Sequence, residues 1–372
     1  MSEKTEMRID ERVNLKLRQL YRSYGYLPLK MDKFEEYDLY IRNRDFIPTE
    51  SIIAFPGSDG KLMTFRPDLT LSIVKNYRPE KETTRKVSYS ESIYRMERDG
   101  DYREILQTGL ECLGTIDAQQ MKEVVLLACK SLRTISPEFI LDISHLGFLQ
   151  EILADAPAEY RSAIASCISK KSVHELAGMA EQGAISETLM ETLRTLIESC
   201  GNYRSALQGL KKLKVSPAAD ACLEELAALC RYLSENRMGR NINIDFSIVN
   251  NMNYYSGITF RGYIRGIPAG ILSGGRYDGV MERSGKPGGA VGFALYLDRL
   301  NMLVKEAREY DVDVILLYEE KDAGDPALAE AAERIRAGGE SLLTERVVPA
   351  GMTCRRLLKF DGGEVRTIEI NG

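Results

Sequence analysis

Histidine is scarce in this chain: His145 and His174 are the only two among 372 residues, so catalysis by a pair of histidines is not expected. Cysteine occurs seven times, an odd number, and no Cys-x-x-Cys spacing is present. The usual patterns of a disulfide framework and of a structural zinc site are therefore missing. Reduced, buried thiols in a cytosolic protein are the simplest interpretation.

Long apolar runs are also missing. No stretch is long enough to span a bilayer. Residues 1–12 are charged throughout and lack the apolar segment of a signal peptide. We therefore expect a cytoplasmic protein with no membrane partner.

The charge balance disfavours one further class of function. The net charge is −5, whereas a general nucleic-acid binder is more often basic, because phosphate contacts drive its affinity. Local basic patches remain compatible with an acidic chain, but nucleic acid is not expected as a partner. The hydrophobic share of 44% and the charged share of 28% are those of an ordinary soluble protein.

Hydrophobic periodicity predicts a large first unit at residues 1–308. Residues 86–95 and 104–114 are predicted to be two antiparallel strands joined by a short loop. Strands are also predicted at 27–34 and 241–249. Strands and helices mixed along one unit indicate an α+β fold.

Two further segments stand out from this pattern. From about 147 to 237 the sequence is helical throughout and rich in Ala, Leu and Glu, which indicates a helical insertion. A helix is predicted at 295–309. Residues 309–372 then follow a β-α-β order, which predicts a small C-terminal α/β module.

Five short motifs occur in order along the first unit: YRMER at 94–98, QTGLE at 107–111, GGRYDG at 274–279, AVGFA at 290–294 and DRL at 298–300. Together they resemble the catalytic core of histidyl-tRNA synthetase, a class II aminoacyl-tRNA synthetase. The resemblance covers roughly residues 5 to 305 and implies the class II fold, in which an antiparallel sheet is flanked by helices.

The resemblance implies a role for two arginines, Arg95 and Arg299. In class II enzymes such a pair clamps the phosphates of ATP, because guanidinium groups bind phosphate bidentately. Here the two side chains are candidates for an anion-binding site. Taken alone, Arg95 is more often a surface ion-pair residue, and it is the surrounding motifs that favour the functional interpretation.

The resemblance also implies a histidine pocket. Asp68 and Thr70 match residues that receive the α-ammonium group, and Glu111 matches the residue that holds the imidazole. The alternative for Glu111 is a buried carboxylate with a structural partner, and for the tyrosines ordinary packing. The histidine-binding candidates are Asp68, Thr70, Gln107, Glu111, Tyr254, Tyr255 and Tyr277.

Departures from the family pattern argue against aminoacylation. Asn250 stands where the family has its catalytic arginine, and the loss of such electrostatic stabilisation costs about two or more orders of magnitude in rate. Asp101 stands where an arginine would approach ATP, and Tyr296 replaces a glycine that leaves room for adenine. Asp32 replaces a proline of the motif that shapes the class II dimer interface.

The candidate histidine-binding residues are retained, whereas residues needed for aminoacylation are replaced. In this combination the chain resembles the regulatory subunits of ATP phosphoribosyltransferase, which are synthetase paralogues in histidine biosynthesis. The resemblance implies no catalytic residues, no cofactor and no metal. It implies a homodimer within a hetero-oligomer formed with the short-form catalytic subunit, and histidine as a candidate ligand. The alternatives are a divergent histidyl-tRNA synthetase and a tRNA- or amino-acid-sensing module.

Overall fold

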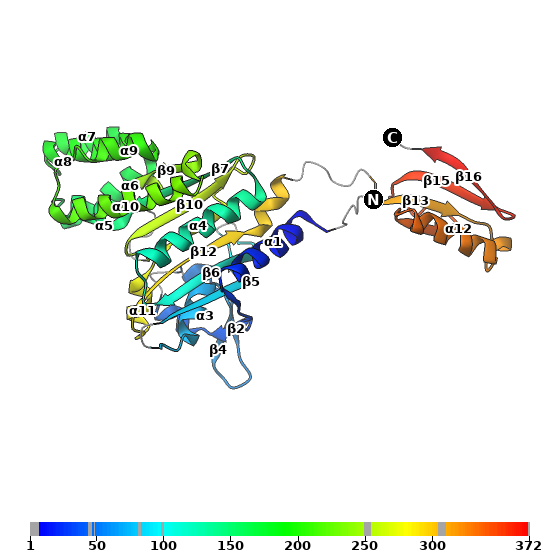
Figure 1. Ribbon diagram of the computed structural model, residues 1–372. Helices are drawn as coiled ribbons and strands as arrows, with labels where there is room; N and C mark the ends of the chain where they lie inside the picture. Colours follow the sequence, from blue (N-terminus) through cyan, green and yellow to red (C-terminus); the bar gives the residue numbers. More distant parts are fainter. Residues whose placement is uncertain are drawn as a thin grey trace. The chain divides into compact units, whose positions relative to one another are not determined.

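A computed structural model describes residues 7–43, 47, 49–80, 83–97, 100–248, 254–303 and 310–370. The chain divides into two compact units, Met1–Leu303 and Val304–Gly372 (Figure 1). No helix within the described ranges combines the length and apolar character needed to cross a membrane.

A nine-stranded sheet organises the first unit. Its strands pair antiparallel, except that β1 runs parallel to β5 and β7 parallel to β9. In sheet order they are β1 (Leu27–Pro28), β5 (Thr84–Met96), β6 (Tyr102–Gly114), β12 (Gly289–Tyr296), β11 (Leu272–Arg276), β10 (Ile258–Ile264), β7 (Phe139–His145), β9 (Ile242–Ile244) and β8 (Gly201–Asn202).

Helices α1 (Ile9–Ser23) and α4 (Ala118–Ile135) lie together against one face of this sheet (Figure 1). The apolar residues of α1 recur every four positions, so that Val13, Leu17 and Tyr21 are buried on one side. Leu110 and Cys112 of β6 belong to the same core. Because strand side chains alternate, Gln107 and Glu111 point to the opposite face.

The opposite face is covered by shorter elements. These are a three-stranded antiparallel sheet and three short helices, α2 (Asp38–Ile41), α3 (Leu69–Asn76) and α11 (Asp278–Arg283). The sheet holds β2 (Phe34–Glu36), β4 (Leu62–Phe65) and β3 (Ala54–Pro56), with β4 in the centre. These elements bring the N-terminus of α3 to the face that carries Glu111.

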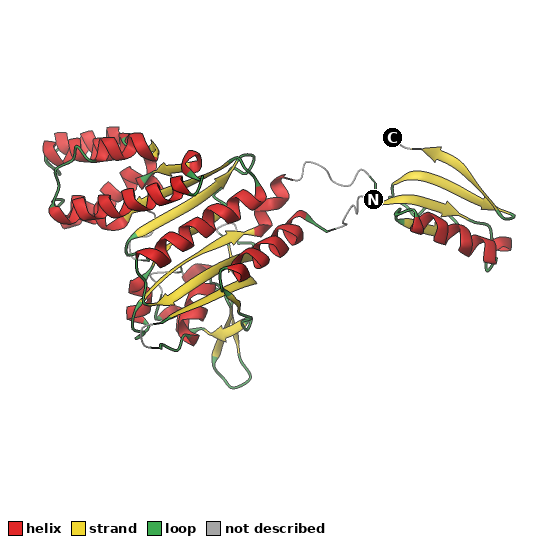
Figure 2. Cartoon of the chain, viewed as in Figure 1, coloured by secondary structure: helices red, strands yellow, loops and turns green. Residues whose placement is uncertain are grey.

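The segment between β7 and β9 is almost entirely helical, as the red ribbons of Figure 2 show. Its helices pack their apolar sides on one another, and their residues join the main core. They are α5 (Leu146–Ala154), α6 (Arg161–Lys170), α7 (Val173–Glu181), α8 (Glu187–Glu198), α9 (Tyr203–Leu210) and α10 (Pro217–Glu235).

The strand predicted at 27–34 is wrong in extent, because the chain pairs with β5 only at Leu27–Pro28 and resumes as β2. Arg66, whose side chain is fully buried, draws the intervening backbone away from β5. Its Nη1 donates to the Asp32 carbonyl at 2.6 Å, and its backbone N–H donates to the Lys33 carbonyl at 2.9 Å.

Two other predicted elements also differ from the structure. The strand predicted at 241–249 ends at Ile244, because Asp245 Oδ1 accepts from the Ser247 N–H at 2.8 Å and turns the chain into a 3₁₀ helix. The helix predicted at 295–309 is a 3₁₀ helix at Leu297–Leu303, since β12 extends to Tyr296. Residues 249 and 304–309 lie outside the described residues.

The second unit is a four-stranded sheet with one helix, α12 (Pro326–Ala337). Strands β14 (Leu342–Glu345) and β15 (Cys354–Asp361) both run parallel to the central β13 (Val312–Leu317), and β16 (Glu364–Ile370) is antiparallel to β15. Val314, Leu316 and Phe360 form its small core.

Candidate functional site

A cavity of about 310 Å³ lies on the sheet face opposite α1 and α4. All seven predicted histidine-binding residues line it, together with Arg95. A larger hollow of about 550 Å³ runs along β1 and the start of β5 and includes none of these residues. The cavity is lined by Asp68, Thr70, Arg95, Gln107, Glu111, Ile248, Tyr254, Tyr255, Thr259, Phe260, Arg261, Ser273, Gly274, Tyr277, Gly292, Phe293, Ala294 and Tyr296.

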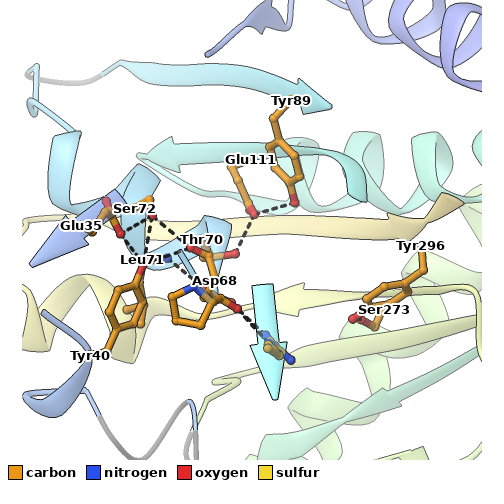
Figure 3. A network of polar contacts seen from close by, with 12 residues as sticks. Glu35, Tyr40, Asp68, Thr70, Leu71, Ser72, Tyr89, Glu111, Ser273 and Tyr296 are labelled. Carbon is orange, nitrogen blue, oxygen red and sulfur yellow. Dashed lines mark hydrogen bonds and ion pairs between the residues drawn. The ribbon is translucent and has the colours of Figure 1, made fainter. Parts of the chain in front are cut away.

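Glu111 lies at the floor of the cavity with only 2% of its surface exposed. Hydroxyl groups surround its carboxyl group. Thr70 donates to Oε1 at 3.0 Å, and the Tyr89 hydroxyl lies 3.5 Å from the same oxygen (Figure 3). Tyr277 donates to Oε2 at 2.6 Å. Burial raises the pKa of Glu111 to about 8, although these hydroxyls stabilise the charged form. In the empty cavity the group is therefore largely protonated at neutral pH.

Glycines make the floor on which these side chains lie. A Cβ on Gly292 would stand 1.6 Å from Glu111 Oε2, and a Cβ on Gly109 would stand 2.7 Å from the Tyr89 hydroxyl. Gly275 likewise leaves room for the Tyr255 ring, whose Cδ1 would lie 2.7 Å from an added Cβ. The GGRYDG motif therefore supplies space as well as its tyrosine.

Asp68 lies at the rim of the cavity and also begins α3. Its Oδ1 accepts from the Leu71 N–H at 2.8 Å, as an N-cap does, while its Oδ2 lies 3.8 Å from Arg95 Nη2. Burial raises the pKa of Asp68, and Arg95 opposes this shift. Arg95 Nε also donates to the Pro67 carbonyl at 2.8 Å, so this arginine is held against the start of α3.

A second polar cluster holds the first turn of α3 from its other side. Ser72 Oγ lies 3.0 Å from the Asp68 carbonyl oxygen and 2.9 Å from Glu35 Oε2, so its single O–H is shared between these two acceptors (Figure 3). The Tyr40 hydroxyl donates to the same Glu35 oxygen. Thr70 lies in this turn and reaches Glu111 from it. The position of Thr70 at the cavity is thus fixed by contacts on both sides.

Three tyrosines form the aromatic wall. The Tyr254 and Tyr255 rings meet edge to face with centroids 4.7 Å apart, and Tyr254 lies 5.8 Å from Tyr277. Burial raises the pKa of all three hydroxyls, so they are neutral donors at physiological pH. Such a wall suits a flat, polar ring.

The second candidate arginine, Arg299, does not line the cavity. Its guanidinium stacks over the Tyr296 ring, 4.5 Å from the centroid, and Nη1 donates to the Gly270 carbonyl. Tyr296 does line the cavity, and its hydroxyl lies 3.3 Å from Ser273 Oγ (Figure 3). Arg95 and Arg299 are therefore not brought together at the cavity surface.

Of the remaining residues that depart from the family pattern, the structure describes Asp101 and Asp32. Asn250 lies outside the described residues. Asp101 is exposed at the end of the turn between β5 and β6, where its carbonyl accepts from the Glu97 N–H at 2.9 Å, and it does not line the cavity. The Asp32 carbonyl accepts a hydrogen bond from Arg66.

Several lining residues were missed by reasoning from sequence, above all Arg261. The sequence contains a signal for it, because Thr259, Arg261 and Tyr263 alternate with Ile258, Phe260 and Gly262. Apolar residues on one side and polar residues on the other indicate that Arg261 faces away from the core.

Similarity to known proteins agrees with this geometry. Residues 3–300 match the family described as Histidyl-tRNA synthetase. An ATP phosphoribosyltransferase regulatory subunit from Anaeromyxobacter dehalogenans is 31% identical over 296 residues, which are 76% of this chain and 83% of that protein.

Two solved structures share the fold. One, an ATP phosphoribosyltransferase regulatory subunit/histidyl-tRNA synthetase from Bacillus halodurans, has a TM-score of 0.77 at 19% identity and covers 96% of this chain and 99% of that chain. The other, in the ATP phosphoribosyl transferase (HisG:HisZ) complex from Thermotoga maritima, has a TM-score of 0.64 at 20% identity, covering 77% and 97% respectively. The chain has a class II aminoacyl-tRNA synthetase-like fold and belongs, within the histidyl-tRNA synthetase family, to the ATP phosphoribosyltransferase regulatory subunits.

Proposed function

We propose that this chain is a subunit without catalysis of its own, which associates with a short-form ATP phosphoribosyltransferase catalytic chain and senses histidine for it. That catalytic chain joins ATP and phosphoribosyl pyrophosphate in the first step of histidine synthesis. The observation that carries the proposal is a cavity built around Glu111 whose lining includes Arg95 but not the second candidate arginine, Arg299, which stacks on the Tyr296 ring.

Histidine fits the chemistry of the cavity. An imidazole N–H donates to the Glu111 carboxylate, and the aromatic wall packs on the ring. Asp68 and Gln107 then receive the α-ammonium group, and Thr70 orients Glu111 through its 3.0 Å hydrogen bond. At about 310 Å³ the cavity is at the small end of the range for ligand sites, which favours one amino acid over a nucleotide.

The proposed loss of aminoacylation rests on the two arginines. Arg95 is occupied by the Pro67 carbonyl and by Asp68, and Arg299 by the Gly270 carbonyl and the Tyr296 ring. A bound ATP would have to break these contacts before its phosphates could be clamped. Asn250 in addition carries no charge with which to stabilise an adenylate.

Regulation adds a thermodynamic condition. Histidine can change the activity of the complex only if it binds two states of the complex with different affinities. The cavity lies within the first unit, between the large sheet and the turn that begins α3. A movement of that turn is the simplest way to change the affinity for histidine.

The proposal is tested with the purified chain and a short-form catalytic chain from the same organism. We expect co-purification, activation of phosphoribosyl transfer and inhibition by histidine. We also expect no histidine-dependent pyrophosphate exchange by the chain alone. Exchange at a rate near that of a true synthetase, or a catalytic chain that is equally active without this subunit, would contradict the proposal.

We further propose that the chain forms a cytoplasmic homodimer, which then joins the hetero-oligomer. Support comes from the outer edge of the large sheet, where β1 pairs with β5 and Leu27 is 63% exposed. An edge strand presents backbone N–H and C=O groups with which a second chain can pair. Light scattering at micromolar concentration should give twice the chain mass, and a monomer would overturn the dimer.

A further inference from the structure

Arg261 is a cavity residue to which neither the sequence motifs nor the proposed histidine contacts assign a role. It belongs to β10, where Thr259 and Arg261 face the cavity side while Ile258 and Gly262 face the core. A guanidinium group on this face stays charged at any physiological pH. Arg261 therefore places a permanent positive charge in a cavity of ligand size.

The guanidinium of Arg261 has no hydrogen-bond or ion-pair partner within the part of the chain that the structure describes. Its direct neighbours across the sheet are Asp142 on β7 and Ser273 on β11. An ion pair with Asp142 would be expected from this register, but none forms. The side chain instead extends over Gly270, where an added Cβ would lie 2.5 Å from Nε.

The charged groups that line the cavity indicate which part of a ligand Arg261 can bind. Two carboxyl groups, Glu111 and Asp68, line the cavity, and the other lining arginine, Arg95, is bound to Asp68 and to the Pro67 carbonyl. A ligand with a ring N–H and an ammonium group uses the carboxyl groups. If the ligand is an amino acid, its carboxylate needs a cation that no protein group already occupies.

We propose that Arg261 binds the α-carboxylate of the amino-acid ligand and so completes its recognition from β10. The inference rests on the proposed histidine site and deepens it. It replaces the expectation, drawn from Asn250, that the ligand carboxylate has no strong partner. A guanidinium and a carboxylate form a bidentate, charge-assisted pair, which is among the stronger polar contacts in proteins.

Histidinol provides the test, because it keeps the imidazole and the ammonium group and lacks the carboxylate. Titration calorimetry on the full chain measures histidine and histidinol with the wild type and with Arg261→Gln. We expect Arg261→Gln to weaken histidine by about 10- to 100-fold, the effect of one lost charge-assisted contact. Its affinity for histidinol should change by less than about 3-fold.

Arg265→Gln is the matched control. Arg265 comes directly after the end of β10, is largely exposed and pairs with Glu138 outside the cavity. It should leave both affinities unchanged. Arg261→Lys keeps the charge without the fork geometry and should fall between wild type and Arg261→Gln for histidine alone. If the unfolding transition shows that Arg261→Gln does not fold, Arg261→Lys takes its place in the comparison of histidine with histidinol.

The outcomes separate this inference from the function on which it rests. If the wild type binds neither ligand, the histidine site and the role of Arg261 fall together. If the wild type binds histidine and Arg261→Gln binds it equally well, only the role of Arg261 is overturned. An equal loss for histidine and histidinol would also overturn it, because a structural role does not distinguish the two ligands.

Discussion

The protonation of the Glu111 carboxyl group affects both the stability of the folded protein and the proposed binding of histidine. Three hydroxyls reach it, yet burial still raises its pKa to about 8 from an ordinary value of 4.5. The folded, empty protein therefore holds a proton that the unfolded chain releases between these two values. Such a group costs stability as the pH rises and is kept for a reason other than folding.

The first prediction concerns the stability of the ligand-free protein. The contribution of Glu111 is fully present below pH 4.5 and is lost as the pH rises through about 8. Between pH 6 and 9 the wild type should lose about 2–3 kcal/mol through this group. Glu111→Gln should lack this loss, as measured by urea unfolding at both pH values, while its histidine affinity falls by about 10- to 100-fold.

Glu104→Gln, at the exposed end of the same strand, is the control for that measurement. It should behave as the wild type does in both unfolding and histidine binding. If Glu111→Gln and the wild type change stability equally between pH 6 and 9, Glu111 is not protonated in the empty cavity.

The second prediction concerns the pH dependence of histidine affinity. Free imidazole titrates near pH ~6.5 and Glu111 near 8, and the complex shares one proton between them. Below the first value a proton must be released on binding, and above the second one must be taken up. Calorimetry at pH 5.5, 7.3 and 8.8 should therefore give the highest affinity at 7.3, with a fall of up to about tenfold per pH unit outside the window. A flat profile would show that the ring does not contact Glu111.

At the scale of elements, the first turn of α3 does two things at once. Asp68 caps the helix through the Leu71 N–H and presents its other oxygen to the cavity, while Ser72 holds the Asp68 carbonyl from behind. Helix stability and ligand geometry are thereby coupled, because any shift of this turn also moves Thr70 away from Glu111. The motif RPDLT at 66–70 is thus a structural element as much as a binding motif.

The third prediction separates these two roles of Asp68. Asparagine is also a good N-cap, so Asp68→Asn should keep stability within about 0.5 kcal/mol and weaken histidine by about tenfold through the lost charge. Asp68→Ala should lose the cap as well, at a cost of about 0.5–2 kcal/mol. Unfolding and calorimetry on both variants measure the two effects.

Asp325 provides the matched control, because it caps α12 in the second unit through the Ala327 N–H at 2.8 Å. Asp325→Ala should remove a cap without changing histidine affinity. If Asp68→Asn binds histidine as tightly as the wild type, the ammonium group is held elsewhere, and Gln107 becomes the first candidate.

At the scale of the whole molecule, every residue of the described ranges that lines the cavity belongs to the first unit, Met1–Leu303. The second unit has a core of its own around β13 and α12. Histidine binding and the fold of the C-terminal module are therefore expected to be independent properties.

The fourth prediction follows from this division. A chain of residues 1–303 should fold by itself and bind histidine within about 3-fold of the full chain, because none of the described lining residues is removed. Calorimetry and thermal unfolding of the two chains make the comparison. A folded 1–303 chain that no longer binds histidine would place part of the site in the second unit.

Much of the fold was determined by the sequence itself. Alternation along 107–111 separates Leu110, which packs in the core, from Glu111, which does not, because a strand exposes successive side chains to opposite faces. The GGRYDG motif marks the place where a strand must carry no side chains and then deliver Tyr277. Local pattern suffices in such cases, because the cause lies in neighbouring residues.

Other features were decided only by the tertiary structure. The strand predicted at 27–34 breaks because Arg66, distant in sequence, takes the backbone carbonyls that β5 would have used. Arg95 and Arg299 both belong to the expected motifs, yet contacts with the Pro67 and Gly270 carbonyls orient them differently. Arg261 faces the cavity because β10 lies between β7 and β11, a register that no local pattern specifies. The sequence determines which charged and polar side chains are present. Long-range packing decides which of these side chains bind other protein groups and which remain available to a ligand.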